Sequence, residues 1–171
     1  SLTQLERYDE ALIYLEQVVS YGYSFFHVNQ CRMILGYIYA ITGRYRLAEF
    51  ELQKVLEDGL RSAQIYASLG YVFYCMRRVD ESVQYLGKAL SLEGDYTTAL
   101  NTLGFIYAEE EIDKIRALEL CRKAVKLKPD NPAYLDSLGW ASYKCGKLAE
   151  ARSYLRRALD FLPGNKEIAD H

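Results

Sequence analysis

Hydrophobic positions recur along this chain with a long and regular period. A leucine, a glycine and then a large aromatic residue occur four times, as LGY, LGY, LGF and LGW. The glycines stand 34, 34 and 35 residues apart, at Gly36, Gly70, Gly104 and Gly139. A register of this length indicates an internal repeat, in which every copy forms the same supersecondary unit.

Further columns of small and apolar residues keep the same register. One column contains Ala48, Ser82, Ala117 and Ala151, and a second contains Val55, Ala89, Ala124 and Ala158. Between these columns lie Leu52, Leu86, Cys121 and Leu155. The spacing predicts two helices per unit, a first helix with the Leu-Gly pair and a second helix with the small columns. Small residues let neighbouring helices approach closely, which offsets the helix-propensity cost of about 1 kcal/mol for each glycine.

Turn residues separate the predicted helices. Gly43 and Gly146 follow the first helix of their units and suit a helix C-terminus. The third unit has EEEIDKIRA (109–117) instead of a glycine turn and is one residue longer, so we expect its turn to bulge. Residues 20–28, SYGYSFFHV, add about three residues before the first full unit, and we expect an irregular connection there.

The pattern resembles the tetratricopeptide repeat, a 34-residue helix–turn–helix unit. Residues 132–165 match the Leu-Gly, Ala, Leu, Ala and Pro positions of that family in register. One departure is Arg32, which stands where the family prefers a bulky apolar residue. The resemblance implies an all-α fold, an α-α superhelix of stacked antiparallel helix pairs. In such a superhelix the first helices line the concave face and the second helices form the convex face.

The resemblance extends over nearly the whole chain and predicts a single repeat domain, residues 1–171. Its parts are a second helix of a partial repeat (1–22), four full repeats (29–62, 63–96, 97–131 and 132–165) and the start of a truncated further helix (166–171). Half units at both ends would expose apolar faces that solenoids normally cap with polar residues. We therefore expect a fragment, or a domain of a longer protein.

Aromatic residues recur where the first helices should face the concave groove. The residue after each glycine is aromatic, and other groove positions add tyrosines, an asparagine and an aspartate. The predicted contact residues are Tyr37, Tyr71, Tyr74, Asn101, Phe105, Asp136, Trp140 and Tyr143. Tyr and Trp give large contact areas and keep a polar tip for hydrogen bonds. The alternative is that these rings only pack on the next repeat, and one ring can do both.

These features predict a noncatalytic scaffold that binds a hydrophobic or aromatic-rich peptide or helix of a protein partner. The basic and asparagine positions with which related domains hold a C-terminal carboxylate are not matched here, so we do not expect an anionic tail as ligand. One alternative is a structural module whose solenoid ends self-associate. Another is an RNA or membrane-surface adaptor, because residues 112–157 contain eleven basic and five acidic residues, many of them on second helices.

Composition narrows the remaining possibilities. The net charge of −2 gives no general case for nucleic acid or membrane binding, and no apolar run is long enough for a membrane span. Two histidines and four scattered cysteines suggest no metal site, no cofactor and no catalytic constellation. The unpaired cysteines favour a reducing compartment such as the cytoplasm. The alanine-rich Leu-Gly pattern of residues 132–165 and the ending EIADH resemble bacterial repeat proteins, including envelope-attached ones. A periplasmic location therefore stays open.

Overall fold

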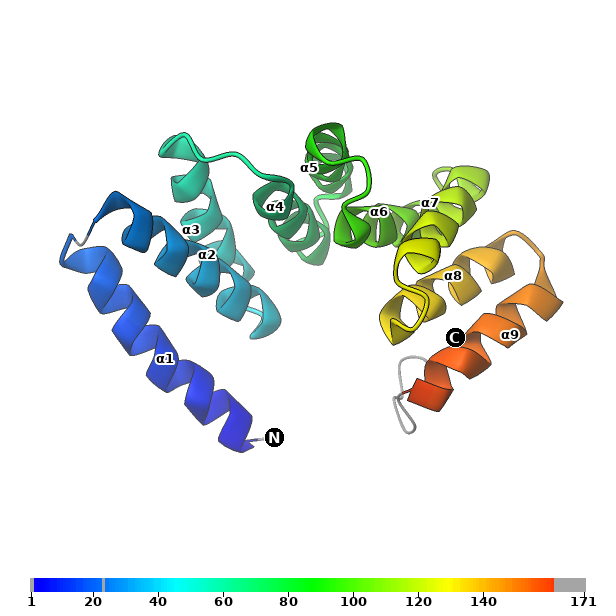
Figure 1. Cartoon of the computed structure of the whole chain (residues 1–171), viewed down its shortest axis with the longest axis horizontal. Helices are drawn as coiled ribbons and strands as arrows, with labels where there is room; N and C mark the ends of the chain where they lie inside the picture. The colour runs from blue at the N-terminus through cyan, green and yellow to red at the C-terminus, as the bar shows by residue number, and fades with distance from the viewer. Residues whose placement is uncertain (1, 23, 162–171) are drawn as a thin grey trace. The chain divides into compact units, whose positions relative to one another are not determined.

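The computed structural model describes residues 2–22 and 24–161, which are all-helical with short connections (Figure 1). The helices of these residues are α1 (Leu2–Ser20), α2 (Phe25–Ile41), α3 (Tyr45–Glu57), α4 (Ala63–Cys75), α5 (Val79–Leu92), α6 (Thr97–Glu109), α7 (Lys114–Leu127), α8 (Pro132–Lys144) and α9 (Leu148–Phe161). They form two compact units, Ser1–Tyr85 and Leu86–His171, which we describe separately. The truncated helix expected at 166–171 lies outside the described residues.

Polar residues at the helix starts explain why several helices begin where they do. Ser62, Asp113 and Asn131 precede α4, α7 and α8, and each accepts a hydrogen bond from a backbone N–H in the first turn. Pro132 follows Asn131 as a first helical residue, where its missing N–H costs nothing. Such side-chain caps satisfy donors that have no partner within the helix.

The helices that carry the Leu-Gly pairs all end with the same backbone closure. Gly43 and Gly146 have φ values of 76° and 74°, as the sequence predicts for helix C-termini. In the other two units the left-handed residue is Arg77, with φ of 63°, or Glu111, with φ of 53°. The connection from α6 to α7 is one residue longer than the connection from α2 to α3. The expected extra length of the third turn is therefore confirmed.

Close helix approach explains the repeated glycines. An added Cβ at Gly36 would lie 2.7 Å from Cγ of Leu52, and at Gly139 it would lie 2.7 Å from the same atom of Leu155. At Gly104 it would lie 2.6 Å from Sγ of Cys121. Each glycine is therefore the site at which a side chain from the following helix enters, and the predicted packing role is confirmed for these three.

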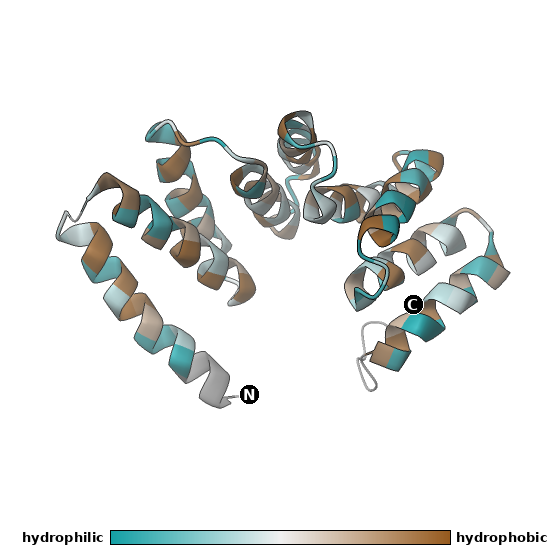
Figure 2. Ribbon diagram, viewed as in Figure 1, coloured by the Kyte–Doolittle hydropathy of each residue, from teal (hydrophilic) through white to brown (hydrophobic). Residues whose placement is uncertain are grey.

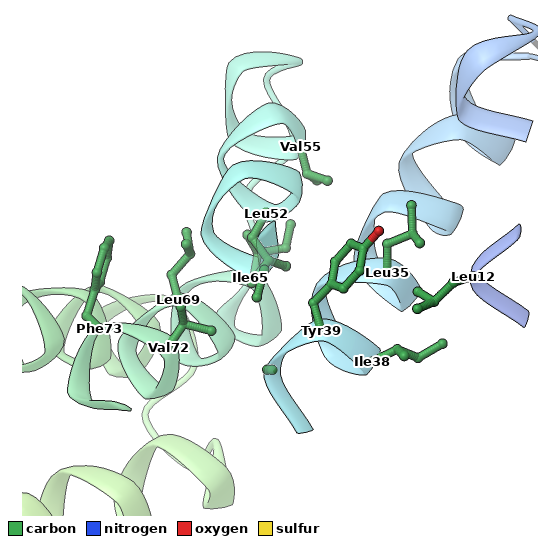
Figure 3. Packing of buried hydrophobic residues seen from close by; sticks show 12 residues of the cluster. Leu12, Leu35, Ile38, Tyr39, Leu52, Val55, Ile65, Leu69, Val72 and Phe73 are labelled. Carbon is green, nitrogen blue, oxygen red and sulfur yellow. The ribbon is translucent and has the colours of Figure 1, made fainter. Parts of the chain in front are cut away.

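Unit 1 is built around one apolar cluster that joins α1 to α4. Figure 3 shows Leu12 of α1 directed toward Leu35 and Ile38 of α2, all three being buried members of the cluster. The small and apolar columns of α3, Ala48, Leu52 and Val55, are at most 2% exposed.

In unit 2 the helix pairs α6–α7 and α8–α9 stack in the same way, and α8 also packs on α6 and α7. Ala117, Cys121 and Ala124 of α7 are fully buried. Figure 2 shows hydrophobic and hydrophilic residues alternating along these helices, as amphipathic packing requires.

The connection before the first full repeat differs from our expectation. Residues 25–28 are helical, and α2 has 17 residues where α4, α6 and α8 have 13. Asn29, which is buried, donates from Nδ2 to the backbone oxygen of Phe25 at 3.0 Å and so supports the added turn. The prediction of an irregular connection over all of residues 20–28 was therefore wrong. The extra helical turn brings Phe25 and Phe26 onto α2.

Candidate functional site

A pocket of about 440 Å³ opens between the first helices of two neighbouring hairpins in unit 1. Its lining residues come from α2, α3 and α4 and are all uncharged. They are Gln30, Met33, Ile34, Tyr37, Leu52, Gln64 and Ser68. Apolar groups with a few amides and a hydroxyl can enclose an apolar side chain and bond the backbone beside it.

Helix geometry brings these residues together. Gln30, Met33, Ile34 and Tyr37 follow the i, i+3, i+4, i+7 spacing, so they share one side of α2. Leu52 of α3 reaches the pocket because Gly36 has no side chain to keep the two helices apart. Gly36 thus allows Leu52 both to pack closely against α2 and to line the pocket.

An exposed apolar stripe continues along α2 beyond the pocket. Phe26 is 64% exposed, Ile34 47%, Tyr37 62% and Ile41 42%. Their spacing of three, four or eight residues keeps them on one helix side over four turns. Phe26 belongs to this stripe only because residues 25–28 are helical. Exposed apolar area of this extent is typical of an interaction surface.

The other predicted residues of unit 1, Tyr71 and Tyr74, lie on α4. Tyr71 is 43% exposed and Tyr74 is half-buried, and neither lines the pocket. Of the four predicted aromatic positions that follow a glycine, only Tyr37 contributes to it.

The predicted aromatic residues of α8 form a polar-aromatic cluster in unit 2. Trp140 stacks on Tyr143 with ring centroids 5.4 Å apart, and the Lys144 ammonium lies 4.9 Å from the Trp140 ring centroid. The Trp140 indole N–H donates to Glu109 of α6 at 2.9 Å. Lys144 also pairs with Glu111 at 3.5 Å. Trp140 therefore ties α8 to α6, while Tyr143 stays 49% exposed.

Three further predicted residues of unit 2 are less accessible. Phe105 and Asn101 are half-buried, and Asp136 is 9% exposed. The buried Oδ1 of Asn101 has no hydrogen-bond partner among the described residues. All three side chains are therefore less exposed than Tyr143.

A polar network behind the pocket was not predicted. Arg32 pairs with Glu51 at 2.8 Å, with both side chains largely buried, and the Tyr39 hydroxyl donates to Glu16. Burial raises the pKa of Glu51, and Arg32 opposes that rise. Burial and the Glu16 hydrogen bond also raise the pKa of Tyr39. Arg32 thus has a defined partner on α3, although it stands where the family prefers a bulky apolar residue.

Leu52 of α3 was not proposed as a contact, and neither were the pocket residues of α2 and α4 other than Tyr37, which are Gln30, Met33, Ile34, Gln64 and Ser68. Their helical register with Tyr37 and Tyr71 is the sequence signal that identifies them.

Residues 7–22 and 24–161 contain no group of three or more His, Cys, Asp or Glu side chains placed to hold a metal ion. Among the described residues, no helix has both the length and the apolar composition that crossing a membrane requires.

Helical hairpins stacked in sequence order define a helical-repeat protein. Models of the tetratricopeptide repeat match residues 30–57, 63–96 and 133–161, together more than half of the chain. The chain belongs to the tetratricopeptide repeat family. Repeats of this kind are in general protein-interaction modules.

Two solved structures and one curated relative show the extent of the likeness. The TPR repeat-containing protein PA4667 of Pseudomonas aeruginosa is 48% identical over 82 residues, which are 48% of this chain and 14% of that protein. TTC0263 of Thermus thermophilus is 19% identical with a TM-score of 0.77, over 99% of this chain and 90% of that one. YrrB, described as a TPR protein with an unusual peptide-binding site, is 19% identical with a TM-score of 0.67, over 99% and 85%. The chain thus spans about one-seventh of the length of PA4667.

Proposed function

We propose that this chain is a noncatalytic scaffold that binds an apolar, aromatic-rich peptide or helix of a protein partner through the pocket between α2 and α4. The observation that carries the proposal is the uncharged pocket of about 440 Å³, continuous with the exposed Tyr37 ring and the apolar stripe of α2. The peptide-binding site described for YrrB, which has the same fold, agrees with this use of the scaffold.

The pocket's chemistry specifies the expected ligand. Met33, Ile34 and Leu52 offer apolar contacts, while the amides of Gln30 and Gln64 offer donors and acceptors to a peptide backbone. No charged side chain lines the pocket, so an ionised group of the ligand would lose water without gaining a partner. We therefore expect apolar side chains to enter and acidic or basic ones to be excluded.

We propose the exposed ring of Tyr71 as a further contact within unit 1 and, as a separate contact within unit 2, the exposed ring of Tyr143. Half-buried Tyr74, Phe105, Trp140 and Asn101, and buried Asp136, would contribute mainly by supporting the first helices.

Selection from a random-peptide display library on the intact chain tests the proposal. Selected peptides should be rich in apolar residues, and Tyr37→Ala should weaken their binding by about ten-fold, because central aromatic contacts dominate such interfaces. Phe50→Ala is the matched control, since Phe50 is a 52% exposed ring on α3 outside the pocket. Unchanged affinity in folded Tyr37→Ala, or an equal loss in both variants, would refute this site.

Self-association is a second candidate, favoured by exposed apolar side chains on α1. Ile13 is 57% exposed and Tyr14 is 71% exposed. Sedimentation at several concentrations separates the two functions, because a pure binding module stays monomeric. A dimer that Tyr14→Ala dissociates would support association through α1.

A further inference from the structure

One face of α9 carries three arginines around two small residues. Ala149, Arg152, Ser153, Arg156 and Arg157 line a hollow of about 390 Å³. All five are exposed. They lie at i, i+3, i+4, i+7 and i+8 along the sequence, a spacing that places all five on one side of the helix. The small residues leave room for another segment to approach α9 between the guanidinium groups.

None of these three arginines has a charge partner in the described part of the chain. Neighbouring basic residues are paired, as in Arg122 with Glu150 at 2.6 Å and Lys123 with Asp95 at 2.7 Å. Arg157 donates to the backbone oxygen of Pro129 at 3.3 Å. Arg152 and Arg156 form no ion pair with described residues. They stand four residues apart on α9, where like charges repel.

The repeat shows what the position of Arg152 contacts elsewhere in the chain. Arg152 is the residue after the small Ala151, and Glu49 is the residue after the equivalent Ala48. Glu49 accepts a hydrogen bond from Arg78 at 2.7 Å, and Arg78 immediately precedes α5. This position on a second helix therefore reaches the start of the next second helix. An arginine there calls for a carboxylate.

The position of Arg156 behaves in the same way. Arg156 lies five residues after Ala151, and Arg122 lies five residues after Ala117. Arg122 on α7 pairs with Glu150 in the first turn of α9. By the same geometry Arg156 is placed to pair with a carboxylate in the first turn of a helix beside α9.

We propose that this arginine face of α9 binds a helix of a protein partner that carries two carboxylates three residues apart at its start. The spacing follows from the repeat, because Arg78 lies four residues before Ser82 and Glu150 lies one residue before Ala151. Carboxylates in a first helical turn are also favoured by the helix dipole. Guanidinium groups bind carboxylates through directed pairs of hydrogen bonds.

The surroundings favour a protein helix over nucleic acid. A nucleic-acid strand needs a continuous row of free cations along its phosphates. Here Glu150 and Asp95 already neutralise Arg122 and Lys123, so the basic residues of α7 and α9 do not form a continuous row of free cations. A compact pair of arginines suits two discrete carboxylates.

Fluorescence anisotropy with a designed probe tests the proposal. The probe is an amphipathic helical peptide of about 16 residues with glutamates at its second and fifth positions, and its matched control has glutamines there. The wild-type chain should bind the glutamate peptide at least about ten-fold more tightly than the glutamine peptide. Arg152→Ala with Arg156→Ala should remove that difference. Lys126→Ala with Lys128→Ala, which removes the same charge from exposed positions around the end of α7, should preserve it.

Three results would overturn the proposal. The first is no binding of the glutamate peptide by the wild-type chain up to about 1 mM. The second is an equal loss in the two double variants, which would indicate only nonspecific attraction. The third is tighter binding of a short single-stranded RNA that depends on Arg152 and Arg156. Circular dichroism confirms folding of the variants, and binding of an apolar peptide through Tyr37 reports separately on the α2–α4 pocket.

Discussion

Replacing Gly104 with alanine should destabilise unit 2, although alanine is the better helix former. Gly104 lies on α6 where α7 comes closest. An added Cβ would lie 2.6 Å from Sγ of Cys121, 3.1 Å from the Ala117 backbone oxygen and 3.2 Å from the Cys121 backbone nitrogen. Two of these three atoms are backbone, so a rotamer change of Cys121 would relieve only the contact to sulfur. The two backbone contacts still require the helices to move apart by a few tenths of an ångström.

The magnitude follows from two opposing effects. Overpacking a tight site costs about 1–3 kcal/mol, and alanine regains about 1 kcal/mol of helix propensity over glycine. From the middle of the overpacking range, about 2 kcal/mol, the free energy of unfolding should therefore fall by about 1 kcal/mol in Gly104→Ala. Gly36→Ala should cost less, because its nearest contacts are all to the flexible Leu52 side chain.

Urea unfolding followed by circular dichroism measures these differences. Gly87 on α5 provides the matched control, because an added Cβ there would meet nothing within 4 Å. Gly87→Ala should raise stability by up to about 1 kcal/mol through helix propensity alone. The double variant Gly104→Ala with Cys121→Ala should recover part of the loss, since it removes the contact to sulfur and keeps the backbone contacts.

A Gly104→Ala variant as stable as the wild type would refute the packing account of the Leu-Gly repeat. The same conclusion would follow if Gly104→Ala and Gly87→Ala changed stability equally, because the difference between them isolates helix approach from propensity.

Further outcomes are expected from the turns and the buried thiol. Arg77→Gly should raise the free energy of unfolding by about 1 kcal/mol in urea titrations, because Arg77 holds a left-handed conformation that glycine adopts without cost. Glu111→Gly should combine the same gain with the loss of its ion pairs with Lys114 and Lys144. Burial raises the pKa of Cys121 from its ordinary value of 9.0 to about 12. Above pH 9 the unfolded chain therefore loses this proton before the folded chain does, and the free energy of unfolding falls by up to about 1.4 kcal/mol per pH unit. Cys121→Ala should flatten that fall. A thiol reagent at neutral pH should leave Cys121 unmodified while it modifies the half-buried Cys145, and equal rates would contradict the burial argument.

Much of the fold followed from periodicity. The repeated glycines predicted both the helix pairs and the close contacts made at Gly36, Gly104 and Gly139, because a fixed register specifies which helix faces meet. Side-chain accessibility was harder to predict. Asp136 occupies a predicted groove position but is buried. Tyr37 and Trp140 occupy equivalent positions in their repeats, yet Tyr37 is largely exposed whereas Trp140 is hydrogen-bonded to Glu109.

The features that sequence reasoning missed depend on side-chain contacts that occur in one repeat only. The helical turn at residues 25–28 has no repeat equivalent, and its support by Asn29 becomes visible only in three dimensions. Arg32 breaks the family pattern because Glu51, on the next helix, provides its partner. A periodic pattern averages over repeats, so it does not report what is particular to one of them.

Nuclear magnetic resonance mapping of a display-selected apolar peptide on the isotope-labelled chain tests the proposed binding site most directly. We predict that the largest backbone amide shifts on peptide addition occur at Gln30, Met33, Tyr37, Gln64 and Ser68, around the pocket between α2 and α4. Shifts confined to other helices, with these five amides unchanged at saturating peptide, would contradict the account.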